Sequence, residues 1–476
     1  MHATSGAVVL GIVVSYLVFT TAVGAWSVKY SKDTNSFMSA KNQMGTYIIS
    51  VLLVSEFVAS ASTLGTSQTA FETGISASWV FISIAIGFLL YSFLLAGKYN
   101  ETKEYTISGI IAQRYGREAR LIVSAIMIYA LITVNVVAYT GGAVVLGTLL
   151  NIPITSAVWV MATAATICVA TGGIRGVGFA NLVHFVAKYA ALVVTAVVAH
   201  NMLKAHPRGW ESLPPIYFSM TGVGVSQIAA WTIGNIGAVF ATQYVIQSIS
   251  SLKNAQEAKK ASMFASLWLL PVGFIAAYIG MVARILFPKI KSVQALPIFL
   301  KYMGPWTAGV VATGILAVAF VTILACHLGA TALVMKDFYA PLVKPSEKHQ
   351  ILAVRILAII LGVLPVPFAL YVPALLKTVF FARALRASLT VIVLFMFYAP
   401  KVGSKRSATV SLVLSVLFTT IWFVLKNPFG IDNMYVAVAT PFVCLLGGAL
   451  FRRMRASSEL EKQSKSATAG IRGEGF

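Results

Sequence analysis

The chain has 476 residues, of which 58% are hydrophobic and 11% are charged. Charged residues make up about a quarter of an ordinary soluble domain, so this composition excludes a soluble globular protein and indicates a polytopic membrane protein. The formal charge of +22 comes from 36 Lys and Arg against 14 Asp and Glu. In a membrane protein this excess belongs to cytoplasmic loops facing anionic lipid, so we expect the lipid bilayer as a partner and no nucleic acid.

Apolar segments recur along the whole chain. A hydrocarbon core of about 30 Å is crossed by about 20 helical residues, and on this criterion we predict an all-α protein with about 13 transmembrane helices. The predicted spans lie near 5–25, 45–73, 77–96, 119–149, 154–172, 178–200, 225–250, 262–286, 306–335, 351–372, 374–398, 406–426 and 433–450.

The basic residues between these spans predict the orientation. If the N-terminus lies outside the cell, most Lys and Arg fall in cytoplasmic connections, as the positive-inside rule requires. The polar end of the chain, RRMRASSELEKQSKSATAGIRGEGF, has no apolar face. We therefore expect a multi-pass protein of the cell membrane with an external N-terminus and a flexible cytoplasmic tail at 451–476.

Two spans contain a break in their apolar pattern. In 45–73 the sequence SEFVASASTLGTSQTAFETG, and in 225–250 the sequence WTIGNIGAVFATQYVIQS, are rich in Gly and small polar residues. Unwound backbone within a membrane is tolerated where it lines a polar cavity, and two interrupted helices in corresponding places are typical of an inverted-repeat transporter. Close helix packing through small residues is the alternative interpretation.

A few ionisable residues fall deep within the predicted spans, and each is a functional candidate because burying a charge in a membrane is costly. They are Glu56, His184, Lys188, His327, Arg383 and Arg386. Glu56 is the one deep carboxylate; it either pairs with Lys188 or Arg386 or carries a cation or a proton. We interpret the two histidines as hydrogen-bonded packing residues. Arg383 and Arg386 are three residues apart, so they share one helix face.

Four segments resemble the sodium:solute symporter family. They are STLGTSQTAFETGIS in the broken second span, GGIRGVGFANLVHF at the start of the sixth, Gln247 followed by SLKNAQEAKKAS, and GILAVAFVTILACHLGATALVMKDFY in the ninth. The resemblance implies a LeuT-type fold, with a core of two inverted five-helix repeats at 45–200 and 201–400. An extra N-terminal helix and cytoplasmic loop at 1–44 and two C-terminal helices at 401–450 would flank that core.

The resemblance also implies a sodium site where the broken second span meets the ninth span. Its carbonyl positions fall on Ser55, Val58 and Val318, and its two adjacent hydroxyl positions fall on Val321 and Thr322. Asn181 stands where the family has Asp. One ligand and one nearby charge are therefore missing, so we expect weaker sodium binding than in the family, unless Glu56 restores the charge.

Polar residues around the two breaks are the candidate substrate contacts, each with helix-to-helix hydrogen bonding as the alternative. They are Ser62, Thr63, Gln68, Asn135, Trp231, Asn235 and Gln243. The excess of intramembrane positive charge, from Lys188, Arg383 and Arg386 against Glu56 with His184 neutral, favours an anionic substrate such as a carboxylate. No HExxH, GxSxG, Walker or GxGxxG motif indicates an enzyme.

We therefore expect a secondary active transporter that couples sodium to the symport of a small polar or anionic organic solute by alternating access. Sodium is the one metal expected, with no transition metal and no cofactor. Proton coupling through Glu56 and uncoupled transport, with the Lys188 ammonium replacing the cation, are alternatives. A membrane sensor that has lost transport is another.

Overall fold

The computed structural model describes residues 3–26, 45–55, 57–150, 152–206, 209–370 and 375–473, and within these ranges it is helical without any strand. The first half contains α1 (Ala3–Trp26), α3 (Thr46–Ser55), α4 (Ser60–Thr73), η2 (Gly74–Ser78), α5 (Trp79–Leu94), α6 (Ala96–Glu101), α7 (Ile107–Tyr115), α8 (Arg117–Leu150), α9 (Ile154–Lys204), η3 (Gly209–Ser212) and η4 (Pro215–Phe218).

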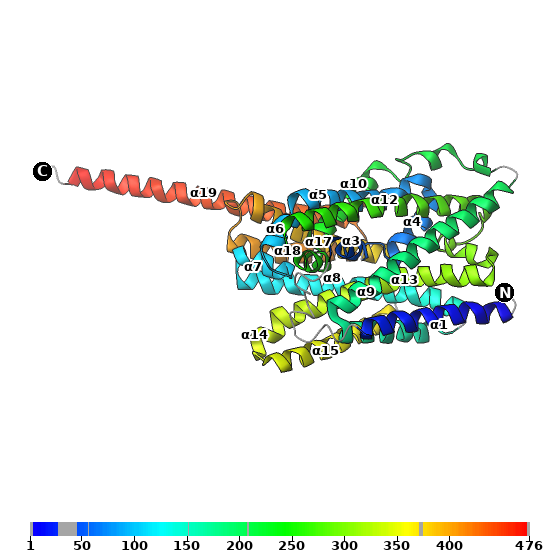
Figure 1. The fold of residues 1–476 in the computed structure, drawn as a ribbon. Helices are drawn as coiled ribbons and strands as arrows, with labels where there is room; N and C mark the ends of the chain where they lie inside the picture. Colours follow the sequence, from blue (N-terminus) through cyan, green and yellow to red (C-terminus); the bar gives the residue numbers. More distant parts are fainter. Residues whose placement is uncertain are drawn as a thin grey trace.

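The second half begins with another interrupted helix. It contains α10 (Val225–Ala241), α11 (Gln243–Ser250), α12 (Ala255–Leu286), η5 (Ser292–Gln294), η6 (Pro297–Tyr302), α13 (Pro305–Leu333), η7 (Val334–Tyr339), α14 (Ala340–Val343), α15 (Glu347–Val363), α16 (Val366–Ala369), α17 (Leu375–Tyr398), α18 (Lys405–Val424), η8 (Pro428–Gly430) and α19 (Asn433–Gly473). The long helices run side by side in one bundle (Figure 1).

Nine helices in the described ranges are long and apolar enough to cross a membrane, and two shorter apolar helices lie at 7–23 and 225–241. One of the nine, α9, has 51 residues and is interrupted at Gly173, whose φ of 54° and ψ of −151° are not helical. A straight helix of that length would measure about 76 Å, more than twice the hydrocarbon core. The interruption lies between the predicted spans 154–172 and 178–200. The polytopic all-α class is confirmed, and the count of 13 stays a prediction.

Both predicted helix breaks are present. α3 ends at Ser55 and α4 begins at Ser60, while α10 and α11 are separated at Thr242, whose φ of −67° and ψ of 124° are extended. Two interruptions of this kind free backbone groups inside the bundle, where side chains or a ligand must satisfy them.

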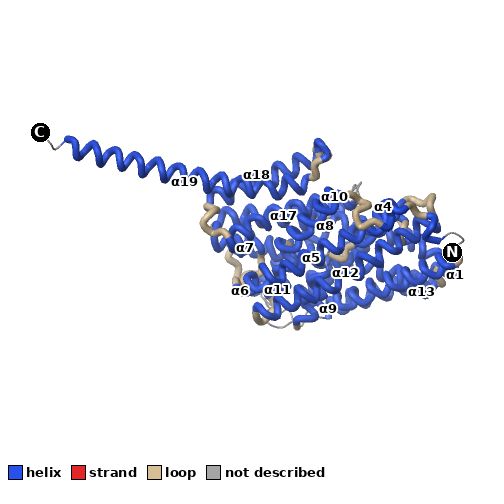
Figure 2. Tube along the Cα trace, turned by 90° about the horizontal axis from the view of Figure 1, so that it is seen from above, coloured by secondary structure: helices blue, strands red, loops and turns tan. Residues whose placement is uncertain are grey.

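The helix α13 forms the centre of the bundle. In its most apolar window 94% of the residues are buried, compared with 28% for α18 and 22% for α19. Its main neighbours are α9, α8 and α1. Figure 2 shows the same bundle from above, with α18 and α19 at its periphery. A residue on α13 is therefore enclosed by protein, whereas α18 and α19 face the surroundings with apolar side chains.

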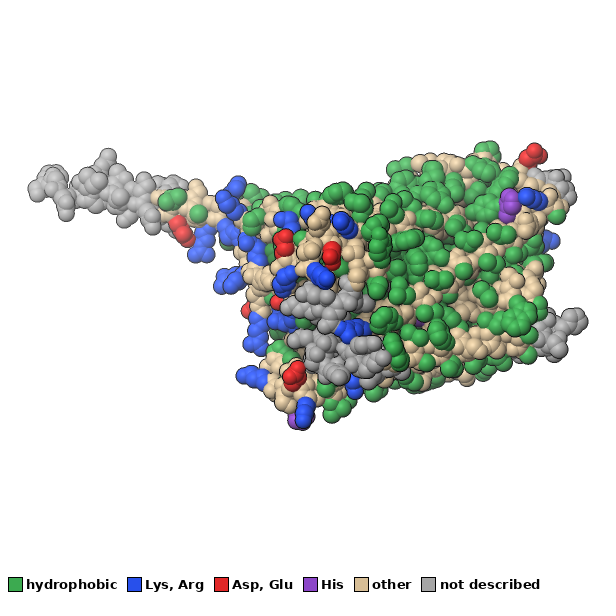
Figure 3. All heavy atoms as spheres, viewed as in Figure 1, with side chains coloured by type: hydrophobic (Ala, Val, Ile, Leu, Met, Phe, Trp, Pro, Cys, Tyr) green, Lys and Arg blue, Asp and Glu red, His purple; other side chains and the backbone are tan. Residues whose placement is uncertain are grey.

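The two termini lie at opposite ends of the bundle (Figure 1). Lys and Arg side chains gather at the end that holds α6, α7 and α14, which we name the basic end (Figure 3). From this end α19 projects as a continuous helix as far as Gly473. The helical form of this polar segment was not predicted. The flexibility of the tail and the domain boundaries stay predictions.

Candidate functional site

Two buried arginines on α17 connect the two broken helices. Nη2 of Arg383 donates to Oγ of Ser62, in the first turn of α4, at 2.8 Å, and its Nη1 donates to Oδ1 of Asn235 on α10, also at 2.8 Å. Nη1 of Arg386 donates to Oγ1 of Thr242, at the break between α10 and α11, at 3.1 Å. The shared helix face expected from their spacing is thus directed at both breaks.

Aromatic and polar groups surround Arg383. The amide of Asn235 donates to the carbonyl of Val80 at 3.0 Å and to Oγ of Ser83 at 2.7 Å, so α5 fixes its orientation. The Trp231 ring stacks on Phe380, with centroids 6.1 Å apart, and the guanidinium of Arg383 lies 4.9 Å from the same Phe380 ring. Ser62, Asn235, Trp231, Phe380 and Arg383 form what we name the arginine cluster. It contains three of the predicted substrate residues.

The predicted cation residues on α13 are enclosed by the bundle. Val318, Val321 and Thr322 are all buried, and Oγ1 of Thr322 donates to the carbonyl of Val318 at 3.2 Å. Val58 is buried within the break between α3 and α4. Ser55 is the last residue of α3, with its side chain outside the described part, and Glu56 lies outside the described residues.

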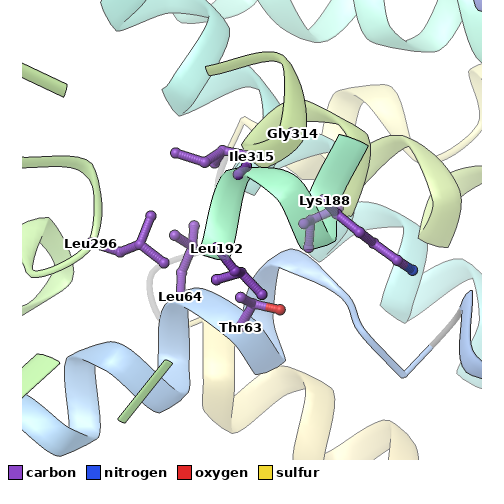
Figure 4. Close-up of a pocket in the computed structure, with 9 residues that line it drawn as sticks. Thr63, Leu64, Lys188, Leu192, Leu296, Gly314 and Ile315 are labelled. Atoms are coloured by element: carbon purple, nitrogen blue, oxygen red, sulfur yellow. The ribbon is translucent and has the colours of Figure 1, made fainter. Parts of the chain in front are cut away.

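Two further polar residues project from α9. The side-chain amide of Asn181 donates to the hydroxyl of Tyr244 on α11 at 3.4 Å, whereas its Oδ1 has no partner among the described residues. Seven positions later, and so on the same helix face, Lys188 lines a small cavity together with Val318 of α13 and Thr63 of α4 (Figure 4). The cavity has a volume of about 10 Å³, about one water molecule.

Each of the two intramembrane histidines makes one hydrogen bond between helices, while the other ring nitrogen has no partner among the described residues. Nδ1 of His184 is hydrogen-bonded to the hydroxyl of Tyr16, which joins the additional helix α1 to α9. Nε2 of His327 is hydrogen-bonded to the carbonyl of Ala358, which joins α13 to α15.

Four predicted substrate residues are not part of the arginine cluster. One of them, Thr63, lines the small cavity described above. Gln68 donates to Oγ of Ser292 in η5 at 3.3 Å. Gln243 accepts from the backbone of Ile107 at 3.0 Å and donates to the carbonyl of Tyr105 at 2.8 Å, so it fastens the loop before α7. Asn135 is buried on α8 with its Oδ1 unpartnered among the described atoms. Their roles in substrate binding stay predictions.

Sequence reasoning missed a polar network at the basic end. Asp337, in the π-helical segment η7, pairs with Nε of Arg120 at 2.6 Å and accepts from Ser108. The neighbouring Lys336 pairs with Glu104. These contacts fasten the end of α13 to α7 and α8. The sequence signal was an Asp between Lys336 and an aromatic residue at the end of an apolar span, and that signal does not identify its partners.

The described residues at the helix breaks offer oxygen atoms of backbone carbonyls, hydroxyls and amides. Among the described residues no group of three or more His, Cys, Asp or Glu could hold a metal ion. Carbonyl and hydroxyl oxygens are the ligands that hard cations prefer.

Comparisons with known proteins agree with this geometry. The model of the sodium:solute symporter family matches residues 37–414. A sodium/proline symporter of Haemophilus influenzae is 21% identical over 382 residues, which cover 74% of this chain and 75% of the relative. The structure of a Na⁺-coupled sialic acid symporter in a substrate-bound outward-open state has a TM-score of 0.77 at 15% identity and covers 94% of this chain and 98% of its own.

A structure of a nucleobase-cation-symport-1 family transporter, in a closed conformation with bromovinylhydantoin bound, is also similar. Its TM-score is 0.57 at 13% identity, covering 87% of this chain and 95% of the transporter. At these identities the solved structures establish the fold alone, and that fold is the LeuT-type arrangement expected from the sequence.

Proposed function

Because the chain belongs to the sodium:solute symporter family, we propose that it couples the inward movement of sodium to the uptake of a small polar organic solute by alternating access. Family membership makes the chain a secondary active transporter rather than an enzyme. We further propose which residues bind the solute and the ion, and how the chain is oriented in the membrane.

The observation that carries the proposal is the position of Arg383. Its two hydrogen bonds join Ser62 of α4 to Asn235 of α10, so one side chain connects elements from both predicted repeats. In alternating access the two repeats rock against each other around a central site. A residue that bridges them must exchange partners during that motion, and a solute with polar groups can take the place of Ser62 or Asn235 as its acceptor.

The sodium ion would bind where α3 ends, close to α13. The carbonyls of Val58 and Val318 and the hydroxyl of Thr322 supply oxygen ligands, and the C-terminal end of α3 carries the negative end of the helix dipole. Val321 cannot ligate, so the site has one oxygen fewer than the family pattern. A cation that joins α3 to α13 favours whichever conformation brings them together, which we assign to the outward-open state.

The direction of transport follows from the charge distribution. Basic side chains gather at the end that holds α6, α7 and α14 (Figure 3). We assign this end to the cytoplasm under the positive-inside rule, which leaves the N-terminus outside and the C-terminal end of α19 inside. Sodium and solute then enter from the end at which the N-terminus lies.

The experiment that tests sodium coupling is thermal stabilisation of the purified, reconstituted protein by sodium, with potassium as control, at several pH values. We expect sodium alone to stabilise the wild type, and Thr322→Ala to weaken sodium binding about tenfold, which corresponds to about 1.4 kcal/mol. Thr409→Ala is a matched control, because Thr409 makes the same hydroxyl bond to the carbonyl four residues earlier, at 3.0 Å, on the peripheral helix α18.

Two results would contradict the proposal. Equal stabilisation by sodium and potassium at every pH would exclude a selective sodium site. A pH response that is lost in Glu56→Gln, without any response to sodium, would instead indicate that Glu56 carries a coupling proton. Uptake into proteoliposomes against a solute gradient would then separate a symporter from a sensor that does not transport.

A further inference from the structure

An apolar groove runs along α1, the helix that the sequence places outside the ten-helix core. We name the two parts of α9, before and after its interruption at Gly173, the first and the second limb. The groove lies between α1 and the second limb and has a volume of about 520 Å³. Its lining side chains are all apolar and include Phe19 and Trp26 of α1, which are 55% and 57% exposed. Within a membrane, such a groove opens to lipid.

One mouth of the groove lies towards the basic end. Tyr16 of α1 contacts His184, whereas Trp26, ten residues later, lies edge-on against Phe179 with ring centroids 6.4 Å apart. The two helices are therefore antiparallel, and the turn at Gly173 lies beyond the last residue of α1. Because α1 starts at the opposite end from the basic end (Figure 1), this mouth faces the basic end. Trp is typical of the membrane–water interface, so the mouth lies at the depth of lipid headgroups.

Arg175 supplies a positive charge at this mouth. It lies four residues before Phe179, so the two share one helix face, and its side chain is half-buried. It is also the second residue after Gly173, in the first turn of the second limb. A cation in the first turn of a helix adds to the positive end of the dipole instead of compensating it. An anion beside this turn is attracted by both charges.

A second groove on the other side of α1 provides a contrast. It lies between α1 and the first limb, has a volume of about 620 Å³ and is lined by residues such as Trp159 and Val160. Neither α1, at 3–26, nor the first limb, at 154–172, contains a Lys or Arg residue. The two grooves thus offer similar apolar space, but only the wall helices of the first carry a cation at the interface.

We propose that the groove between α1 and the second limb binds an anionic phospholipid, with one acyl chain against Phe19 and Val183 and its phosphate on Arg175. A guanidinium suits this role, because it donates two parallel hydrogen bonds to a phosphate. The lipid belongs to the leaflet on the side of the basic end, which the orientation proposed above makes the cytoplasmic leaflet. This site is separate from the helix breaks, and its occupation does not depend on which ion is coupled.

The test is the quenching of Trp26 fluorescence by brominated acyl chains in the full-length protein. The protein is reconstituted in nanodiscs of phosphatidylglycerol, which is anionic, and phosphatidylcholine, which is zwitterionic, with bromine on one lipid or on the other. The difference between the wild type and Trp26→Phe isolates the signal of Trp26. We expect phosphatidylglycerol to be enriched beside Trp26 about tenfold over its share of the bilayer, which corresponds to about 1.4 kcal/mol.

Matched variants separate the charge from the groove. Arg175→Gln should abolish the preference for phosphatidylglycerol, and Arg175→Lys should retain most of it. Lys405→Gln should behave as the wild type, because Lys405 lies beside Gly116 at another part of the basic end. Val183→Phe, which fills the groove, should reduce quenching by both lipids, whereas Val160→Phe in the second groove should leave it unchanged.

Each other outcome overturns the proposal or a defined part of it. Equal quenching by both brominated lipids in the wild type would refute a site that selects charge. An equal loss of preference in Lys405→Gln and Arg175→Gln would assign the effect to the whole basic surface. If glycerol phosphate in the buffer removed the preference, a phosphate group without acyl chains would be the ligand. Full quenching in Val183→Phe would place the acyl chain outside the groove.

Discussion

The contact between α9 and α13 at Gly314 gives the sharpest structural prediction. Gly314 lines the cavity that contains Lys188 and Val318. A Cβ atom at this position would lie 2.2 Å from Cβ of Ala191 and 2.4 Å from the carbonyl oxygen of Ala187. Non-bonded carbon atoms attract each other best at about 3.5–4.0 Å. Gly314→Ala must therefore separate the two helices by about 1 Å, because neither neighbour is a side chain that can rotate away.

The expected magnitude follows from two opposing effects. Overpacking costs about 1–3 kcal/mol, whereas Ala favours a helix over Gly by about 1 kcal/mol. We expect Gly314→Ala to lose about 1–2 kcal/mol of unfolding free energy and to bind sodium about tenfold more weakly, since Val318 moves relative to α9. Gly309→Ala should cost less, because its near neighbour at 2.5 Å is the terminal Cδ1 of Ile12.

Gly11→Ala, with no atom within 4 Å of the new Cβ, is the control and should be neutral or slightly stabilising. The assay is reversible unfolding in mixed micelles, titrated with denaturing detergent, followed by sodium binding to the folded fraction. If Gly314→Ala is as stable as Gly11→Ala and binds sodium normally, the close approach of α9 and α13 does not hold the cavity together.

Three further predictions concern the polar groups of the bundle. Asn181→Asp, which restores the family carboxylate beside the predicted ion ligands, should strengthen sodium binding about tenfold in the thermal assay, and unchanged affinity in a folded variant would exclude Asn181 from the site. Arg383→Gln and Asn235→Ala should show a coupling of about 1.5–3 kcal/mol in a double-mutant unfolding cycle, whereas additive losses would mean that their 2.8 Å bond contributes nothing. Asp337→Asn should lower the unfolding free energy by about 2–3 kcal/mol, which is less than the loss expected for a fully buried ion pair, because the side chain of Arg120 is 29% exposed. Glu104→Gln should lower it by under about 1 kcal/mol, because the side chain of Glu104 is itself 28% exposed. Similar unfolding free energies for these last two variants would contradict the importance of burial.

Helix positions could be predicted from the sequence where long apolar runs are separated by Gly or polar residues. The two interrupted spans were expected at 45–73 and 225–250, and the helices there run over 46–73 and 225–250. The gap between the spans 154–172 and 178–200 contains the interruption at Gly173. Hydropathy and helix length are local quantities, so one sequence is sufficient for these features. The helical continuation of α19 was not expected, because a polar segment carries no apolar pattern that indicates helix.

The candidate site was predictable only in part. The three-residue spacing of Arg383 and Arg386 predicts a shared face, but nothing local reveals that this face meets Ser62 on one broken helix and Thr242 on the other. Residue type also fails to separate a cavity-lining amide from one that fastens a loop. Gln243 binds the backbone near α7, whereas Asn235 binds Arg383. Such pairings are tertiary, and spacing along one chain does not encode them.

The changes around the predicted sodium site all act in the same direction. Val321 removes an oxygen ligand, Asn181 removes a negative charge and Lys188 adds a positive one, and each of these weakens the binding of a cation on its own. A carrier that held sodium tightly without solute could return across the membrane with the ion alone, and the gradient would dissipate. A weak ion site whose affinity depends on an anionic solute avoids that leak, because neither ligand is held well until both are present. The loss of family ligands is therefore compatible with strict coupling, provided that the solute supplies the missing negative charge.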